Sequence, residues 1–453
     1  MQNSPQNLVL EFAKTLLKRI KKPSFIVLVG IFLLAGLLRI YKFDSVPRTG
    51  ATFDEFAWTW LGMSLLDGKQ PTSWSPHSLY QERKQVQYLG AYFLIVTPYL
   101  EHPPLFGIIA GGFAKLNGVS DIFLVTTYKI RPLAIVMGMT SVLLLLLYIK
   151  RVYEKNVAVL AMLLFATVPT VVIGSKIVQN ENFFVPMWLL SLLLLHQYIG
   201  TKKIRYKYLS FIVAGVLPLA KIPWLIGSFS LALILSYNKK WKDAAQAIIV
   251  GLIFLSLFVV YGMYYDADLF FNLFRFQLAR YDISFAGIYS LLTDPLLLDR
   301  GYVDGWIFMG WFAIFYLAMD IKKHYWIVLP FFSYFILYAF AIPNEPGHGW
   351  YRYPFYPFTL SALAIVFEQQ YKKTSLFFVI SILFISLAIL SNTWVYKFGF
   401  SYTVMRIVIL LACGSFLLPL WVRKFEIIRK PLFIFWIALL ILGNIWSVLG
   451  FIE

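Results

Sequence analysis

Charge is scarce in this sequence. Charged residues make up 14% of its 453 residues, whereas hydrophobic residues make up 60%. A soluble domain usually carries about 25% charged residues, so this composition excludes a large soluble fold. Apolar runs of about 20 residues, which is enough to span a bilayer, recur instead from Phe25 almost to the C-terminus. We therefore predict an all-α polytopic membrane protein.

Cysteine is nearly absent. The single cysteine, Cys413, lies inside an apolar run, which excludes a disulfide within the chain and a thiolate metal site. Also missing are a Gly-x-x-x-x-Gly-Lys phosphate loop, a His-Glu-x-x-His metal motif, a Gly-x-Ser-x-Gly nucleophile motif and a strand-linked dinucleotide fingerprint. Asp266 and Asp268 could contact a cation, but two oxygens in a loop do not define a metal site, and we expect no metal dependence. An activated donor carried by the membrane is the simplest expectation that remains.

The basic residues are gathered in short clusters. A formal net charge of +18 would suit a nucleic-acid partner. Clusters between apolar runs are instead typical of cytoplasmic loops, which are enriched in Lys and Arg. We therefore predict no nucleic-acid partner and use the clusters as topology signals. They lie at 18–22, 150–155, 202–207, 239–242, 322–323, 372–373 and 423–430.

Placing every cluster on the cytoplasmic side gives one consistent path, with the N-terminus inside and the C-terminus outside. Residues 1–23 are then a basic amphipathic cytoplasmic arm, and residues 24–453 form a single transmembrane domain. The run from Phe25 to Leu38 has no small-x-small cleavage site, so we expect it to remain as an anchor. The path has about 13 spans. They fall near 24–41, 132–149, 157–175, 183–199, 208–221, 222–237, 244–262, 304–320, 325–342, 353–368, 375–391, 404–422 and 431–450.

Two long outer loops, 42–131 and 263–303, form the predicted active-site face, since long loops in compact proteins usually carry function. Between Tyr88 and Asn117 there are two apolar runs of roughly 15 residues, each short for a span. They either cross together as a hairpin or both lie at the membrane surface. Their shortness favours two membrane-lying helices. Most carboxylates also fall on this outer side, although carboxylates hardly influence topology.

A pair of carboxylates, Asp54-Glu55, follows the first span in an apolar and aromatic setting. Such a setting disfavours the ionised form, which suits a carboxyl group to general-base work on an acceptor hydroxyl or amine. The alternative is a helix N-terminus, where acidic side chains complement the helix dipole. Both residues are candidate catalytic groups.

A second motif is Glu101-His102-Pro103-Pro104. Its prolines stiffen the backbone and can start a helix at the membrane surface. His102 could donate to a phosphate or share a proton with a carboxylate. The alternative is a histidine that is satisfied at the surface. Glu101 and His102 are candidate substrate-binding residues.

Several basic residues lie on the outer half, against the charge trend, and two of them stand out. The full set is Arg48, Lys176, Lys221, Arg275, Arg280, Arg300 and Arg352. Lys221 lies between two apolar helices, and Arg352, next to Tyr353, begins a later one. An ionisable residue in a spanning region is costly and by default indicates function. Arg and Lys both suit a membrane-embedded phosphate, so these three residues are candidates for substrate binding. The alternative is that the cations snorkel or pair with loop carboxylates.

These residues, taken in order, resemble the GT-C glycosyltransferases, in particular the branch of protein O-mannosyltransferases and aminoarabinose transferases that uses polyprenyl-phosphate sugars. The resemblance is carried by short motifs, mainly in the first half of the chain. They are Arg39, Asp54-Glu55, Gly68, Glu101-His102-Pro103-Pro104-Leu105, Gly118-Val119-Ser120, Arg131-Pro132, Ala166-Thr167-Val168-Pro169, Lys176, Asn180-Glu181, Leu219-Ala220-Lys221 and Arg352-Tyr353-Pro354. We find no large soluble tail or inserted sugar-binding module, so acceptor preference is not inherited from the protein-modifying members.

The resemblance implies an inverting sugar transfer from a polyprenyl-phosphate donor at the outer face of the cytoplasmic membrane, with Asp54 as catalytic base. It also implies that Glu101 and His102 line the site and that Lys221 and Arg352 hold the lipid phosphate. The sugar, which could be a hexose or a pentose, the glycan, lipid or protein acceptor and the oligomeric state stay open. The main competing class is a transporter or flippase. It would show inverted repeats and polar residues in paired half-helices, and the sequence shows neither.

Overall fold

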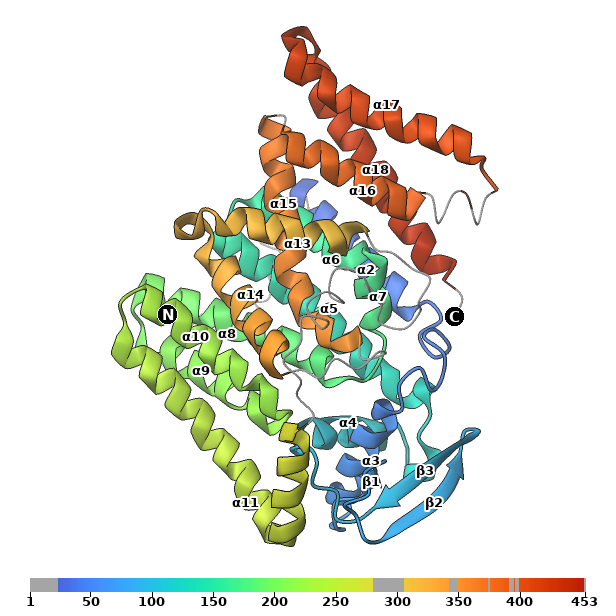
Figure 1. The fold of residues 1–453 in the computed structure, drawn as a ribbon, viewed down its shortest axis with the longest axis vertical. Coiled ribbons are helices and arrows are strands. Elements are labelled where there is room, and N and C mark those ends of the chain that lie inside the picture. The colour runs from blue at the N-terminus through green and yellow to red at the C-terminus, as the bar shows by residue number, and fades with distance from the viewer. Residues whose placement is uncertain are drawn as a thin grey trace, which may run out of the picture.

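The computed structural model describes residues 23–279, 305–341, 349–373, 375–390, 395 and 399–451. Figure 1 shows a bundle of helices with a small sheet at one end of the molecule. The predicted arm 1–23, except Pro23, lies outside the described residues, as does the part of the second predicted outer loop from residue 280 onward.

The apolar runs form helices, because a helix satisfies every backbone N–H and C=O within its own segment when no water is available. Each predicted span falls largely on helical residues. Among the described residues, six helices are long and apolar enough to cross a membrane: α5 (Thr127–Val152), α8 (Asn180–Thr201), α11 (Trp241–Ala279), α14 (Ile321–Ala341), α17 (Tyr402–Trp421) and α18 (Glu426–Leu449). This is the composition of a polytopic membrane protein, and the number of crossings stays a prediction.

The other elements of the bundle are shorter. The α-helices are α2 (Pro23–Ile40), α6 (Lys155–Thr167), α7 (Pro169–Gly174), α9 (Ile204–Gly215), α10 (Ile226–Tyr237), α13 (Gly305–Ala318), α15 (Tyr356–Lys372) and α16 (Leu376–Leu390). The 3-10 turns are η1 (Ile122–Leu124), η2 (Leu217–Leu219), η3 (Ile222–Leu225), η4 (Gly349–Phe355) and η6 (Arg423–Phe425).

Two helices of the first outer loop, α3 (Asp54–Leu66) and α4 (Leu105–Leu116), pack with their backbones in direct contact. A Cβ atom on Gly62 would lie 1.7 Å from the carbonyl oxygen of Gly107, so only glycine permits this approach. The contact therefore fixes the paired carboxylates at the start of α3 relative to the proline-rich segment that precedes α4.

The prediction of two membrane-lying helices between Tyr88 and Asn117 is wrong for the first apolar run. That run forms a strand in a three-stranded antiparallel sheet of order β1-β3-β2, so the fold is not all-α. The strands are β1 (Ser73–Trp74), β2 (Arg83–Tyr88) and β3 (Ala91–Val96). Phe93 is buried while the neighbouring Tyr92 is exposed, an alternation that fits a half-buried strand rather than a helix. Leu89 and Gly90, both at positive φ, close the β2–β3 hairpin.

The second outer loop also differs from the prediction. Instead of ending near residue 262, α11 continues as a helix through a kink at Asp266, whose φ and ψ are −166° and 102°. The carboxylate of Asp266 accepts a hydrogen bond from the backbone N–H of Leu269 at 2.9 Å, which caps the part after the kink. That part places Phe270 in one buried apolar cluster with Tyr99 of the first outer loop. Figure 1 shows the end of α11 beside α3 and α4.

Candidate functional site

Asp54 is the first residue of α3 and is half-buried. Its Oδ2 atom accepts a hydrogen bond from Gln179 Nε2 at 3.3 Å, and its backbone N–H donates to Thr52 Oγ1 at 3.3 Å. No donor to its other oxygen, Oδ1, is found among the residues that the structure describes. A carboxylate with one fixed oxygen and one oxygen that is open among the described residues can accept a proton at the open oxygen.

Glu55 points into the core instead. Arg131 Nη2 and Nε donate to its two carboxylate oxygens at 2.9 and 3.0 Å, and the Val178 N–H donates to Oε2 at 3.1 Å. Both side chains of the ion pair are 0% exposed. The structure therefore divides the two carboxylates: Glu55 fixes the start of α3 from inside, whereas Asp54 is half-buried and contacts Gln179.

Glu101 is also buried. His77 Nε2 lies 3.3 Å from its Oε2, while Oε1 has no hydrogen-bond partner in the described part of the chain. Burial and the nearby Glu101 carboxylate raise the pKa of Tyr80 well above its ordinary value, and the pKa of Tyr99 for the same reasons. Both hydroxyls therefore stay protonated and remain hydrogen-bond donors.

His102 lies against the aromatic surface of α3. Its ring centroid is 4.8 Å from that of Trp58 and 6.1 Å from that of Tyr99. Trp58 lies one turn after Asp54, so the two side chains share a face of the helix. The structure thus brings His102 to the side of α3 that carries Asp54.

Lys221 has a partner from a distant part of the sequence. Its Nζ atom lies 2.9 Å from Glu181 Oε1 and 4.2 Å from the centroid of the Tyr351 ring. The pairing with a loop carboxylate, which the sequence left open as an alternative, is therefore present. Glu181 Oε2 is buried and has no hydrogen-bond partner among the described residues.

Arg352 and Tyr353 lie on η4, and both are buried. Tyr353 lies beside Arg39 in the bundle interior. Tyr351, two residues earlier, supplies the ring that contacts Lys221. The sequence prediction included Arg352 and Tyr353 of this turn but not Tyr351.

The segment 178–181, which leads into α8, contacts these groups in turn. Its backbone and side chains bind, in chain order, Glu55, Asp54, the carbonyl of Ala220 and Lys221. One short segment thus sets the relative positions of the open carboxylate, the buried ion pair and the cation. The sequence prediction included Asn180-Glu181 only through the resemblance and missed Gln179. A polar run at 179–182 between two apolar runs was the available signal.

Metal ligands are not grouped in the described residues: no three His, Cys, Asp or Glu side chains there lie close enough together to hold a metal ion. Asp266, one of the two residues that could have contacted a cation, caps the second part of α11.

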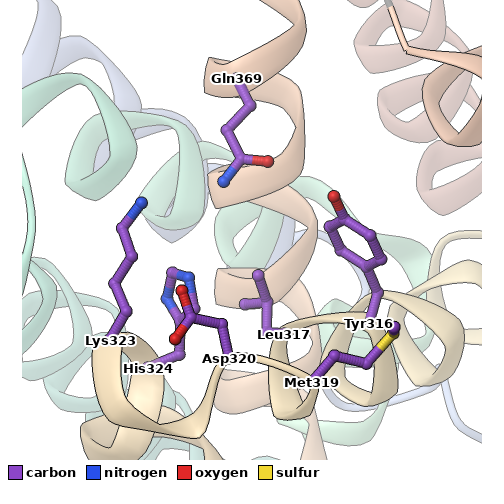
Figure 2. Close-up of a pocket in the computed structure, with 7 residues that line it drawn as sticks. All are labelled: Tyr316, Leu317, Met319, Asp320, Lys323, His324 and Gln369. Carbon is purple, nitrogen blue, oxygen red and sulfur yellow. The ribbon is translucent and has the colours of Figure 1, made fainter.

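A cavity of about 260 Å³ lies elsewhere, between the turn that joins α13 to α14 and α15 (Figure 2). Buried His324 forms part of its wall, with Nδ1 2.9 Å from the hydroxyl of Tyr153. The full lining is Tyr316, Leu317, Met319, Asp320, Lys323, His324 and Gln369. It contains none of the predicted site residues and belongs to the basic turn assigned to the cytoplasmic side, so it does not mark the site around Asp54.

Residues 101–264 match the family model described as dolichyl-phosphate-mannose-protein mannosyltransferase. The matched segment contains Glu101, His102 and Lys221 but neither Asp54 nor Arg352. A comparison with curated proteins gave no match.

Among solved structures, arabinosyltransferase EmbB from Mycobacterium smegmatis is similar with a TM-score of 0.53 and 11% identity, over 92% of this chain and 41% of that one. The archaeal oligosaccharyltransferase AglB from Archaeoglobus fulgidus gives a TM-score of 0.48 and 11% identity, over 90% of this chain and 56% of that one. The chain spans about half the length of these structures, and its likeness to EmbB is one of fold. Together with the family match, this likeness confirms the resemblance to the GT-C glycosyltransferases.

Proposed function

We propose that this protein is a membrane glycosyltransferase that moves a sugar from a polyprenyl-phosphate donor to an acceptor at the outer face of the cytoplasmic membrane. The observation that carries the proposal is that residues 179–181 hold both groups: Gln179 binds one oxygen of Asp54, and Glu181 pairs with the buried cation Lys221. Transfer from a lipid phosphate needs a base for the acceptor and a positive charge for the leaving phosphate. The matched family, whose description names dolichyl-phosphate-mannose, supports this donor class.

The donor phosphate would bind at Lys221 and Arg352, which are both buried. Cations in such a low-dielectric setting attract a phosphate more strongly than they would in water. An ammonium group has three N–H donors, and one of those of Lys221 is donated to Glu181. The Tyr351 ring packs against the ammonium group and limits its hydration.

The chemical step is an inverting displacement. The acceptor oxygen or nitrogen attacks the anomeric carbon on the face opposite the phosphate, while its proton passes to Asp54 Oδ1. The bond between the anomeric carbon and the phosphate oxygen breaks, and its electron pair leaves with the polyprenyl phosphate. Lys221 and Arg352 stabilise the charge that develops there.

The remaining predicted residues have separate roles in this proposal. Glu101 and His102 bind hydroxyl groups of the sugar or of the acceptor, since His102 packs against Trp58 on the face that carries Asp54 and Glu101 directly precedes His102. Glu55 positions the start of α3 through Arg131. Tyr353 supports η4 from the bundle interior.

The test is a transfer assay with the purified protein in lipid vesicles. Polyprenyl-phosphate mannose and a polyprenyl-phosphate pentose are supplied separately, with an envelope extract that contains glycans, lipids and proteins as acceptors. Release of polyprenyl phosphate, together with an inverted anomeric configuration in the product, would support the proposal. A folded protein that releases no polyprenyl phosphate from either donor would contradict it.

A further inference from the structure

Gln179 is a buried amide, 1% exposed, that joins two distant segments. Its Nε2 atom donates to Thr52 Oγ1 at 2.9 Å and to Asp54 Oδ2 at 3.3 Å. Its Oε1 atom accepts a hydrogen bond from the indole N–H of Trp58 at 3.4 Å. A single side chain from the loop before α8 therefore contacts residues on both sides of the α3 N-terminus and in the next turn of α3.

The amide can make these contacts in one orientation only. An indole nitrogen is a donor without acceptor capacity, and an ionised carboxylate is an acceptor without a donor. Trp58 therefore requires the amide oxygen to face it, and Asp54 requires the amide nitrogen. Turning the amide over would set donor against donor at Trp58 and acceptor against acceptor at Asp54.

We infer that Gln179 is the positioning residue of the catalytic base: it binds one oxygen of Asp54, so that the other faces the acceptor. This inference rests on the proposed function, in which Asp54 takes the acceptor proton. The hydrogen bond from Gln179 Nε2 occupies Oδ2 and leaves Oδ1 as the oxygen that takes the proton. It also holds the carboxylate plane, which a proton transfer over hydrogen-bond distance requires.

The sharpest test is Gln179→Glu, which keeps the size of the side chain and an acceptor for Trp58. It would place a second carboxylate about 3.3 Å from that of Asp54. Two carboxylates at that distance share a proton, because both do not ionise without strong repulsion. We expect the acid limb of the pH–rate profile to move to higher pH by at least ~1 unit, with activity recovering as the pH rises further.

Gln179→Leu and Trp58→Phe test the positioning in two other ways. The leucine removes the donor to Asp54, and the phenylalanine removes the indole N–H that fixes the amide orientation. We expect kcat to fall at least ~10-fold in Gln179→Leu and by less in Trp58→Phe, while KM for the donor changes by less than ~2-fold.

Gln85→Glu is the matched control, since it makes the same chemical change at an exposed position of β2. It should leave the pH–rate profile of the wild-type protein unchanged. The inference would be overturned if Gln179→Glu folded with an unshifted acid limb, or if Gln179→Leu kept wild-type kcat. The proposed function stands or falls separately, by whether the wild-type protein releases polyprenyl phosphate from either donor in the transfer assay.

Discussion

Glu55 and Arg131 form an ion pair in the protein interior in which both side chains are 0% exposed. The pair is bidentate, with Nη2–Oε1 and Nε–Oε2 distances of 2.9 and 3.0 Å. Arg131 also donates to three backbone carbonyls of the segment before α3, at residues 43, 47 and 48. The pair therefore fixes the backbone on both sides of Asp54. We infer that Glu55, the other carboxylate of the Asp54-Glu55 motif, has a structural role.

The first prediction is that Glu55→Gln lowers stability much more than the loss of a helix-terminal charge would. Removing one partner of a buried pair leaves an uncompensated charge and costs about 3–5 kcal/mol, whereas a terminal charge is worth about 0.3–1 kcal/mol. Denaturant unfolding in detergent measures the difference. Adding Arg131→Met should recover part of the loss, because both charges are then removed. A loss below ~1 kcal/mol in the single variant would contradict the structural role.

The second prediction concerns Asp54→Asn, which is nearly isosteric but does not take up the acceptor proton. A general base contributes typically ~10²–10⁴-fold, so turnover should fall at least ~100-fold. Donor affinity and unfolding should stay close to wild type, because Asp54 is half-buried and makes no ion pair in the described structure.

Asp67→Asn is the control for that variant. Asp67 follows the last residue of α3 and pairs with Lys115 and Lys69 near the surface. Surface pairs contribute about 0–1 kcal/mol, so this substitution of the same kind should leave turnover unchanged. Full activity in Asp54→Asn would remove Asp54 as the base, even though the fold is similar to that of EmbB.

The sequence predicted most of the bundle, because long apolar runs have few options in a membrane. It failed where the run was short. The apolar run that forms β3 is too short for its length to distinguish a surface helix from a strand. Its hairpin is stabilised by pairing with β2. The extension of α11 past Asp266 was also missed, because an acidic residue in an apolar run looks like a helix end.

The candidate site was predicted in part. Asp54, His102 and Lys221 could be identified, since charged or polar groups in apolar surroundings stand out by themselves. The residues that pair with them could not be identified from the sequence. Glu181 and Gln179 reach Lys221 and Asp54 across 40 and 125 residues, and only the folded chain determines which loop carboxylate pairs with which cation.

The third prediction is topological and uses the single native cysteine. In a Cys413→Ser protein, a cysteine at the exposed position Ser78 should react with a membrane-impermeant maleimide on intact cells. A cysteine at the exposed Lys323 should react only after permeabilisation. A reporter fused after Asn117 should likewise be outside, because it belongs to the same outer loop. Labelling in the reverse pattern would overturn the assignment of the site to the outer face.

The last prediction separates donor binding from folding at Lys221. Lys221→Gln alone leaves the buried Glu181 without its partner, so it should destabilise the protein by about 3–5 kcal/mol, and any loss of donor binding would be ambiguous. Lys221→Gln combined with Glu181→Gln removes both charges and should recover much of that stability.

If Lys221 holds the donor phosphate, this double variant should still bind polyprenyl phosphate at least ~10-fold more weakly. A hydrogen bond to a charged group contributes about 1.5–3 kcal/mol, and about 1.4 kcal/mol corresponds to a tenfold change in affinity. Glu181→Gln alone should bind it more tightly, because the ammonium group no longer divides its donors between a carboxylate and the phosphate. Arg352→Gln should weaken binding as the double variant does. If both the double variant and Arg352→Gln bound polyprenyl phosphate with wild-type affinity, Lys221 and Arg352 would have structural roles only. This conclusion would hold whatever the result at Asp54.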